Sequence, residues 1–265
     1  MPKNENEAAD GFDAARPDVT RDGFLDGALT LLQPAHGYRA GGDAVLLAAA
    51  VPAVAGESVL DVGAGIGAVA LALAHRVREL RVDGIELQAE LVRLGAENAR
   101  VNRLQARVVL HQGDLAAAPS AILAKTYDQV VTNPPYHDGA GSRAAPERSR
   151  ALARSESHVA LAEWLAFCLA RLRPGGTLTL IHRADRLDEV LGGLGEGTGG
   201  TIVYPLWPGR GRAAKRVIVQ TVKASRVPLT VAPGLILHRA DGRHSEAAEA
   251  ILRRGAALRL RPGEA

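Results

Sequence analysis

The chain has 265 residues, of which 47% are hydrophobic, and a formal net charge of +3. Its length suits one α/β domain with additions, and no apolar run approaches the roughly 18 to 20 residues that would span a bilayer. The single cysteine, Cys168, excludes an intramolecular disulfide and a cysteine-based metal site, which favours a reducing cytoplasmic location.

The first 26 residues are acidic, with seven Asp or Glu against three Lys or Arg. This composition argues against a secretory or organellar leader. We predict a disordered acidic tail over residues 1–20 and a single domain over residues 21–265. The domain is expected to divide into an N-terminal segment (21–55), a core (56–223) and a C-terminal extension (224–265).

Two elements are expected ahead of the core. Residues 24–32 predict a short hairpin around Gly27. Residues 43–50 predict a helix with Asp43 as its N-cap, ending near Pro52.

The core alternates short β-rich runs with longer amphipathic stretches. The expected strands are residues 58–62, 82–86, 107–111, 127–132 and 176–182, and the expected helices are residues 68–77, 89–102, 115–124, 158–171 and 185–194. Alternation at this spacing predicts a parallel, doubly wound sheet.

The last core strands are expected to differ from the others. Residues 201–206 and 216–222 have no helix between them, and the Pro and Gly residues of 207–212 predict a loop, so the two strands should pair as an antiparallel hairpin. The result is a seven-stranded, mostly parallel sheet with an antiparallel final hairpin. Residues 229–260 predict a short strand and a helix packed on the same domain.

A glycine-rich turn follows the first core strand, with Gly63, Gly65 and Gly67 in the run 61–67. Glycines at the carboxyl end of a strand allow a tight turn and let a ligand approach the backbone. The run also satisfies a dinucleotide-binding pattern, and Glu86 at the end of the next strand could hold a ribose in either kind of site.

The run Asn133-Pro134-Pro135-Tyr136 ends the fourth core strand. Consecutive prolines cannot continue a central strand, so the chain stops at a rigid turn. The Asn133 side-chain oxygen and the Pro134 carbonyl then offer two acceptors of fixed geometry beside an aromatic ring. Such a pocket suits a planar group that carries an NH2.

Together these motifs resemble methyltransferases that use S-adenosylmethionine (SAM) to methylate amino groups on nucleobases or glutamine side chains. The resemblance implies a class I, Rossmann-like fold, with Asp61 near the methionine part of SAM and Gly113-Asp114 in the adenine-binding turn. It also implies that Asn133 and Pro134 hold the target amine while Tyr136 stacks on the base.

A narrower resemblance is carried by residues 33–48, which include Gly37-Tyr38-Arg39 and an Asp-x-x-Leu-Leu-Ala run from Asp43, and by residues 215–217 and 237–242. These blocks look like the bacterial tRNA(Val) adenine N6-methyltransferases, which modify the adenosine next to the anticodon. By analogy, Arg39 and Asp43 would help to form the cofactor end of the pocket, although a salt link or helix cap would explain them equally well.

An RNA substrate is also suggested by charge. Residues 207–226 contain six Lys or Arg and no acid, although Arg is common throughout this chain. Tyr136, His137, Arg210, Arg212, Lys215 and Arg216 are the candidate RNA contacts, with further arginines in the stretch 137–158. No spacing of His, Asp or Glu suggests a metal.

Four alternatives remain open. A glutamine methyltransferase shares the Asn-Pro-Pro-Tyr logic but usually has a helical domain ahead of the sheet, for which roughly 40 residues are too few. A guanine N2-methyltransferase of rRNA usually has a duplicated N-terminal half. A catalytically silent RNA-binding module and a nicotinamide-dependent oxidoreductase are the other two.

Overall fold

The structure is a computed structural model, which describes residues 18–37, 39–135 and 160–261. The chain enters through an antiparallel hairpin of β1 (Val19–Phe24) and β2 (Leu29–Pro34). Its turn places Gly27 at a positive φ of 85°, which confirms the predicted hairpin. The predicted tail lies outside the described residues as far as residue 17. Its boundary at residue 20 is wrong, because the buried Val19 already belongs to β1.

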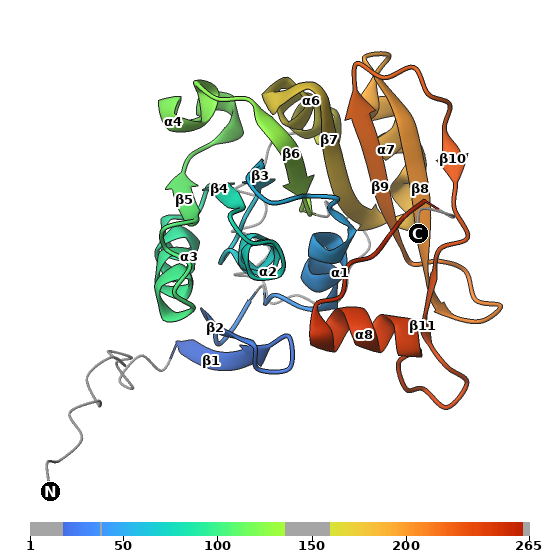
Figure 1. The fold of residues 1–265 in the computed structure, drawn as a ribbon, viewed down its shortest axis with the longest axis horizontal. Coiled ribbons are helices and arrows are strands. Elements are labelled where there is room, and N and C mark those ends of the chain that lie inside the picture. Colours follow the sequence, from blue (N-terminus) through green and yellow to red (C-terminus); the bar gives the residue numbers. More distant parts are fainter. Residues whose placement is uncertain (1–17, 38, 136–159, 262–265) are drawn as a thin grey trace, which may run out of the picture.

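The central sheet has nine strands among the described residues, in the order β10-β8-β9-β7-β6-β3-β4-β5, with β11 also paired to β8 (Figure 1). The strands are β3 (Ser58–Val62), β4 (Arg81–Glu86), β5 (Val108–Gln112), β6 (Tyr127–Thr132), β7 (Leu172–Arg183), β8 (Thr198–Gly209), β9 (Arg216–Lys223), β10 (Thr230–Val231) and β11 (Leu235–His238). β3 to β7 run parallel, and β9 lies antiparallel between β7 and β8. The predicted α/β fold with an antiparallel final hairpin is confirmed.

Helices cover both faces of the sheet because neighbouring strand residues point to opposite sides. The helices are α1 (Gly42–Ala50), α2 (Ala68–Arg76), α3 (Ala89–Val101), α4 (Ser120–Leu123), α6 (Leu161–Arg171), α7 (Leu187–Leu194) and α8 (Glu246–Arg254), with short 3-10 turns η1 (Leu115–Ala117) and η2 (Ala184–Arg186). In β6, Val131 packs in the core with α1, α2, α3 and α8, whereas Val130 packs in the core with α4, α6 and α7.

Two expectations about the late strands are wrong. Residues 207–209 are not loop but the end of β8, and the extension after residue 224 contributes two strands rather than one. The reason is a long-range pairing: β11 runs parallel to the end of β8, with Leu235 opposite Leu206 and His238 opposite Gly209. The sheet therefore exceeds the predicted seven strands.

Four predicted helices differ in their ends. Pro119, which has no N–H to donate, divides the expected helix 115–124 into η1 and α4. The expected helix 185–194 begins as η2, and α6 starts at Leu161, after residues 158–159 that lie outside the described ranges. Gly41, not Asp43, is the N-cap of α1, because the Asp43 carboxylate is paired with Arg216 instead.

Among the described residues, no helix has the length and apolar character needed to cross a membrane. The same residues contain no group of three or more His, Cys, Asp or Glu side chains that could hold a metal ion.

Candidate functional site

The glycine-rich turn and the Asn-Pro-Pro run leave the sheet side by side. β3 and β6 are parallel neighbours, and the last residue of each, Val62 and Thr132, face each other in register. The Thr132 hydroxyl donates a hydrogen bond of 2.7 Å to the Val62 carbonyl and locks the two ends together. Gly63 and Asn133, the next residues, therefore begin at the same point of the sheet edge.

The backbone of the turn, residues 63–67, depends on glycine. Gly63, Gly65 and Gly67 have φ values of 73°, 57° and 81°, a region that residues with a side chain rarely adopt. The N–H groups of Gly63 and Ala64 both donate to the Ile85 carbonyl, at 2.9 and 3.0 Å. The turn is thus fixed to the end of β4.

Three other elements support this turn from behind. A Cβ on Gly63 would lie 2.9 Å from the Trp164 ring of α6, and one on Gly84 of β4 would lie 2.8 Å from the Ala64 side chain. A Cβ on Gly95 of α3 would lie 3.3 Å from the carbonyl carbon of Ile66. These close approaches show that α6, β4 and α3 pack tightly against the turn.

Trp164 was not among the sequence candidates. Its indole N–H donates to the Thr132 hydroxyl at 2.9 Å, while its ring lies against Gly63. One side chain thereby supports both motifs of the site. No motif marks it in the sequence, where it reads as an apolar residue of an amphipathic helix.

Asp61 is the acid of the site most changed by its surroundings. It is 2% exposed, and its Oδ2 atom has no hydrogen-bond partner among the described residues. Burial raises the pKa of Asp61 to about 7; the Ala70 backbone N–H lowers it in part, and the charge of Glu86 raises it further. A buried carboxylate with an unpaired oxygen is a place where a ligand donor or cation would be favourable.

Glu86 ends β4 next to the glycine turn. Its Oε2 atom accepts the Gly65 N–H at 2.9 Å and its Oε1 atom accepts the Gln88 N–H at 3.0 Å. Its carboxylate, half-buried, keeps spare acceptor capacity on both oxygens. The placement suits an acid that receives hydroxyl groups of a ribose.

The turn after β5 lies close to Glu86, because the Gly113 N–H donates to the Glu86 backbone carbonyl at 2.9 Å. Asp114 caps η1, with its Oδ1 atom accepting the Ala116 N–H at 2.9 Å. In the structure, Asp114 therefore acts as the N-cap of η1. Its role in binding an adenine stays a prediction.

The Asn-Pro-Pro run changes from buried to exposed as it leaves β6. Asn133 is half-buried, Pro134 is buried and Pro135 is exposed. Tyr136 and His137, predicted to stack on or touch the substrate, lie outside the described residues. The arrangement places a polar side chain and a rigid turn beside the glycine turn.

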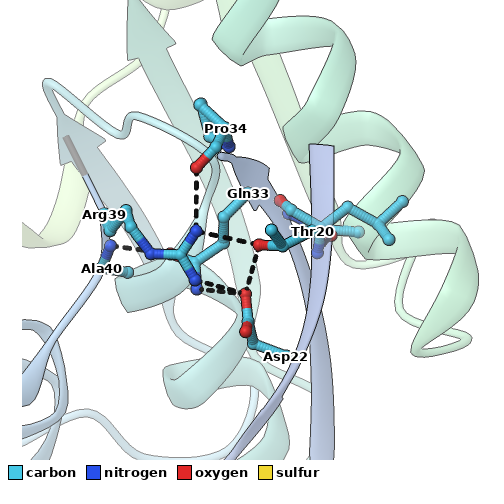
Figure 2. Close-up of polar contacts among 8 residues, drawn as sticks. Thr20, Asp22, Gln33, Pro34, Arg39 and Ala40 are labelled. Carbon is cyan, nitrogen blue, oxygen red and sulfur yellow. Dashed lines mark hydrogen bonds and ion pairs between the residues drawn. The ribbon is translucent and has the colours of Figure 1, made fainter. Parts of the chain in front are cut away.

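Arg39 forms part of a polar network with the N-terminal hairpin (Figure 2). Its guanidinium donates to the Thr20 hydroxyl and the Pro34 carbonyl at 2.9 Å each, and contacts the Asp22 carboxylate at 2.7 Å. Partial burial would raise the pKa of Asp22, but hydrogen bonds from Thr20 and Gln33 and the Arg39 charge lower it below its usual value. The observed contacts make Arg39 a structural tie, and its predicted cofactor contact is untested.

Asp43 and Arg216 were expected at the cofactor and at the RNA, and the structure pairs them. Arg216 Nε lies 3.0 Å from Asp43 Oδ2 and joins the start of β9 to the start of α1. Arg210, Arg212 and Lys215 are exposed in the β8–β9 loop, and none of the three has an ion pair among the described residues. Because β9 runs antiparallel to β7, the start of β9 lies beside the end of β7. The β8–β9 loop is therefore at the edge of the sheet where β3 and β6 also end.

Known proteins resemble this chain in sequence. The pattern of the methyltransferase small domain family matches residues 41–186. A tRNA1(Val) (adenine(37)-N6)-methyltransferase of Porphyromonas gingivalis is 35% identical over 158 residues, which cover 57% of this chain and 61% of that protein. A protein of the same name from Aeromonas hydrophila is 30% identical over 210 residues, which cover 78% of this chain and 86% of its own.

Solved structures agree at the level of the fold. A protein from Agrobacterium tumefaciens, described as a predicted O-methyltransferase, has a TM-score of 0.68 at 25% identity, covering 82% of this chain and 98% of its own. A 16S rRNA N2 methyltransferase of T. thermophilus, solved with AdoMet and guanosine, has a TM-score of 0.53 at 22% identity, covering 77% of this chain and 50% of its own. With the family pattern covering more than half of the sequence, the chain belongs to the methyltransferase small domain family.

Proposed function

We propose that the chain uses SAM to methylate an exocyclic amino group of RNA, and that its target is N6 of adenosine 37 in tRNA(Val). One observation carries the chemistry: the register of Val62 and Thr132 sets the glycine turn beside Asn133. The target base comes from the relatives, which are named as methyltransferases of that nucleotide.

The residues around the glycine turn fit SAM. Glu86 offers acceptors for the ribose, and the buried Oδ2 atom of Asp61, which has no hydrogen-bond partner among the described residues, favours a donor or cation nearby. When bound, SAM supplies a methyl group on a positively charged sulfur. We assign the binding of SAM to residues that lie in or beside the turn of residues 63–67, namely Asp61, Gly63, Gly65, Gly67 and Glu86.

Asn133 and Pro134 would orient the amine. The lone pair of an exocyclic amino nitrogen is delocalised into the base, which makes it a poor nucleophile. If the Asn133 side-chain oxygen and the Pro134 carbonyl accept its two N–H bonds, the nitrogen becomes more tetrahedral and its lone pair is aimed at the methyl carbon. Positioning of this kind is a large part of catalysis in a displacement reaction. The amine proton is then released to solvent, and no general base is needed.

The RNA-binding surface would lie along the same edge. From β6 the edge passes over β7 to β9 and β8, which lie about 10 and 14 Å from β6 at the usual spacing of strands. Arg210, Arg212 and Lys215 lie in the β8–β9 loop along it. The loop after β11 adjoins them, since a His238 ring nitrogen lies 3.0 Å from the Pro208 carbonyl. Cations at this distance from Asn133 suit phosphates that flank a target nucleotide.

The decisive experiment incubates the protein with labelled SAM and with unmodified total tRNA and rRNA, and identifies the methylated nucleoside after digestion. We expect N6-methyladenosine in tRNA(Val). N2-methylguanosine in rRNA would replace the proposed target by the guanine alternative. If the protein binds SAM but transfers no methyl group to any RNA, the RNA methyltransferase proposal is excluded. The remaining alternatives are then a glutamine methyltransferase and a catalytically silent binding module.

A further inference from the structure

Two asparagines, Asn98 in α3 and Asn102 at its C-cap, pair with β2 as a neighbouring strand would. Asn102 Oδ1 accepts the Thr30 N–H at 2.8 Å, and its amide donates to the Thr30 carbonyl at 2.7 Å. Asn98 Oδ1 accepts the Leu32 N–H at 2.6 Å, and its amide donates to the Leu32 carbonyl at 3.1 Å. The spacing matches, because four helical residues rise about 6 Å and two strand residues about 6.8 Å.

Asn98 makes one contact that Asn102 does not. Its side-chain amide also donates to the Ile66 carbonyl in the glycine turn, at 3.1 Å. The side chain is 0% exposed, and both amide hydrogens and the oxygen have partners. Asn98 therefore joins the N-terminal hairpin to the turn through one buried group.

The Ile66 peptide needs such a contact. Gly65 and Gly67 flank it, and both adopt positive φ values, so the local sequence leaves this backbone free to take other conformations. α3 approaches the same peptide closely at Gly95, where a Cβ would lie 3.4 Å from the Ile66 oxygen. Among the described residues, the Asn98 amide is a polar group that fixes the direction of this carbonyl.

We propose that Asn98 is a positioning residue of the SAM site, which holds the Ile66 peptide in its binding conformation and couples that conformation to docking of the hairpin. The proposal rests on the proposed function, in that the glycine turn binds SAM. Binding of SAM and docking of the hairpin should then favour each other by the same factor.

The matched pair Asn98→Ala and Asn102→Ala tests this proposal. Both variants lose hydrogen bonds to β2, and both should lower the melting temperature. Only Asn98→Ala also frees the Ile66 carbonyl, so it should weaken SAM binding on the order of tenfold, as for the loss of one buried hydrogen bond. Asn102→Ala should stay within about twofold of wild type. In turnover, Asn98→Ala should raise KM for SAM while KM for RNA is unchanged.

Equal SAM affinity in the two variants, at equal loss of stability, would overturn the positioning role and leave Asn98 as a fold residue only. Failure of the wild-type protein to bind SAM would instead remove the proposed function itself.

A measurement on the wild-type protein tests the same coupling without depending on whether a variant folds. Amide hydrogen exchange at Thr30 and Leu32, whose N–H groups donate to the two asparagines, should slow when SAM is added. Unchanged exchange at both amides, with SAM bound at saturation, would show that the hairpin and the turn are not coupled.

Discussion

At the scale of single residues, Asn133 has the simplest role to test. It lies beside the glycine turn rather than within it, since it follows β6 and the turn follows β3. Asn133→Ala should lower kcat at least about a hundredfold, because the target amine loses one of its two acceptors and its orientation. The SAM dissociation constant, measured by calorimetry, should change less than about twofold. Near-normal turnover of the purified variant would remove Asn133 from the chemistry.

Asp61 makes stability depend on pH. Burial raises its pKa to about 7 in the folded protein, above the usual value of an aspartate in an unfolded chain. The folded state therefore binds the proton more tightly, so this residue lowers the free energy of unfolding as the pH rises from about 4 to 7, and the loss is complete above the folded pKa. SAM binding should improve over the same upper range, since ionised Asp61 attracts a cation.

The variant Asp61→Asn removes this titration. In denaturant unfolding it should be more stable than wild type at pH 8, with a difference that shrinks toward pH 5. Its SAM affinity should be lower at pH 8 and should no longer rise with pH. Parallel stability curves for the two proteins between pH 5 and 8 would contradict the raised pKa.

At the scale of elements, the turn between β3 and α2 depends on its neighbours as much as on its glycines. Gly63→Ala would place a Cβ 2.9 Å from the Trp164 ring at a φ of 73°, and Trp164 in turn holds Thr132. We expect more than about tenfold weaker SAM binding.

Gly56→Ala is the matched control for this variant. Gly56 has a φ of 86° but open space around it, in the turn ahead of β3. It should lose about 1 kcal/mol of stability and keep its SAM affinity. Equal effects of the two variants on SAM binding would mean that backbone strain alone, and not the contact with Trp164, explains the loss.

At the scale of the whole molecule, the β8–β9 loop brings the exposed Arg210 and Arg212 to the edge where the parallel strands end. Arg210→Glu with Arg212→Glu should weaken RNA binding and flatten its dependence on salt by about two units of slope, without changing SAM affinity. The control, Arg78→Glu with Arg103→Glu, makes the same change of charge in exposed turns ahead of β4 and β5, at the opposite edge. Filter binding at several salt concentrations would compare them, and equal losses would show a general effect of net charge.

Local patterns in the sequence were enough for most elements and for the order of the motifs. The strand of residues 58–62 and the strand of residues 127–132 were placed correctly to the residue, because each apolar run stops where the glycine-rich turn or the Asn-Pro-Pro run begins. The hairpin around Gly27 and the helix starting at residue 68 follow from equally local signals. The fold class followed from the spacing of these elements.

Tertiary structure decided the rest, because pairing over long distances in the chain leaves no local pattern. Only the sheet register puts Gly63 beside Asn133, and only β11 turns residues 207–209 from an apparent loop into strand. Trp164 and Asn98 read as ordinary helix residues until their contacts with Thr132 and Ile66 are seen. The raised pKa of Asp61 likewise depends on burial, which is a property of the packed molecule and not of the residues on either side.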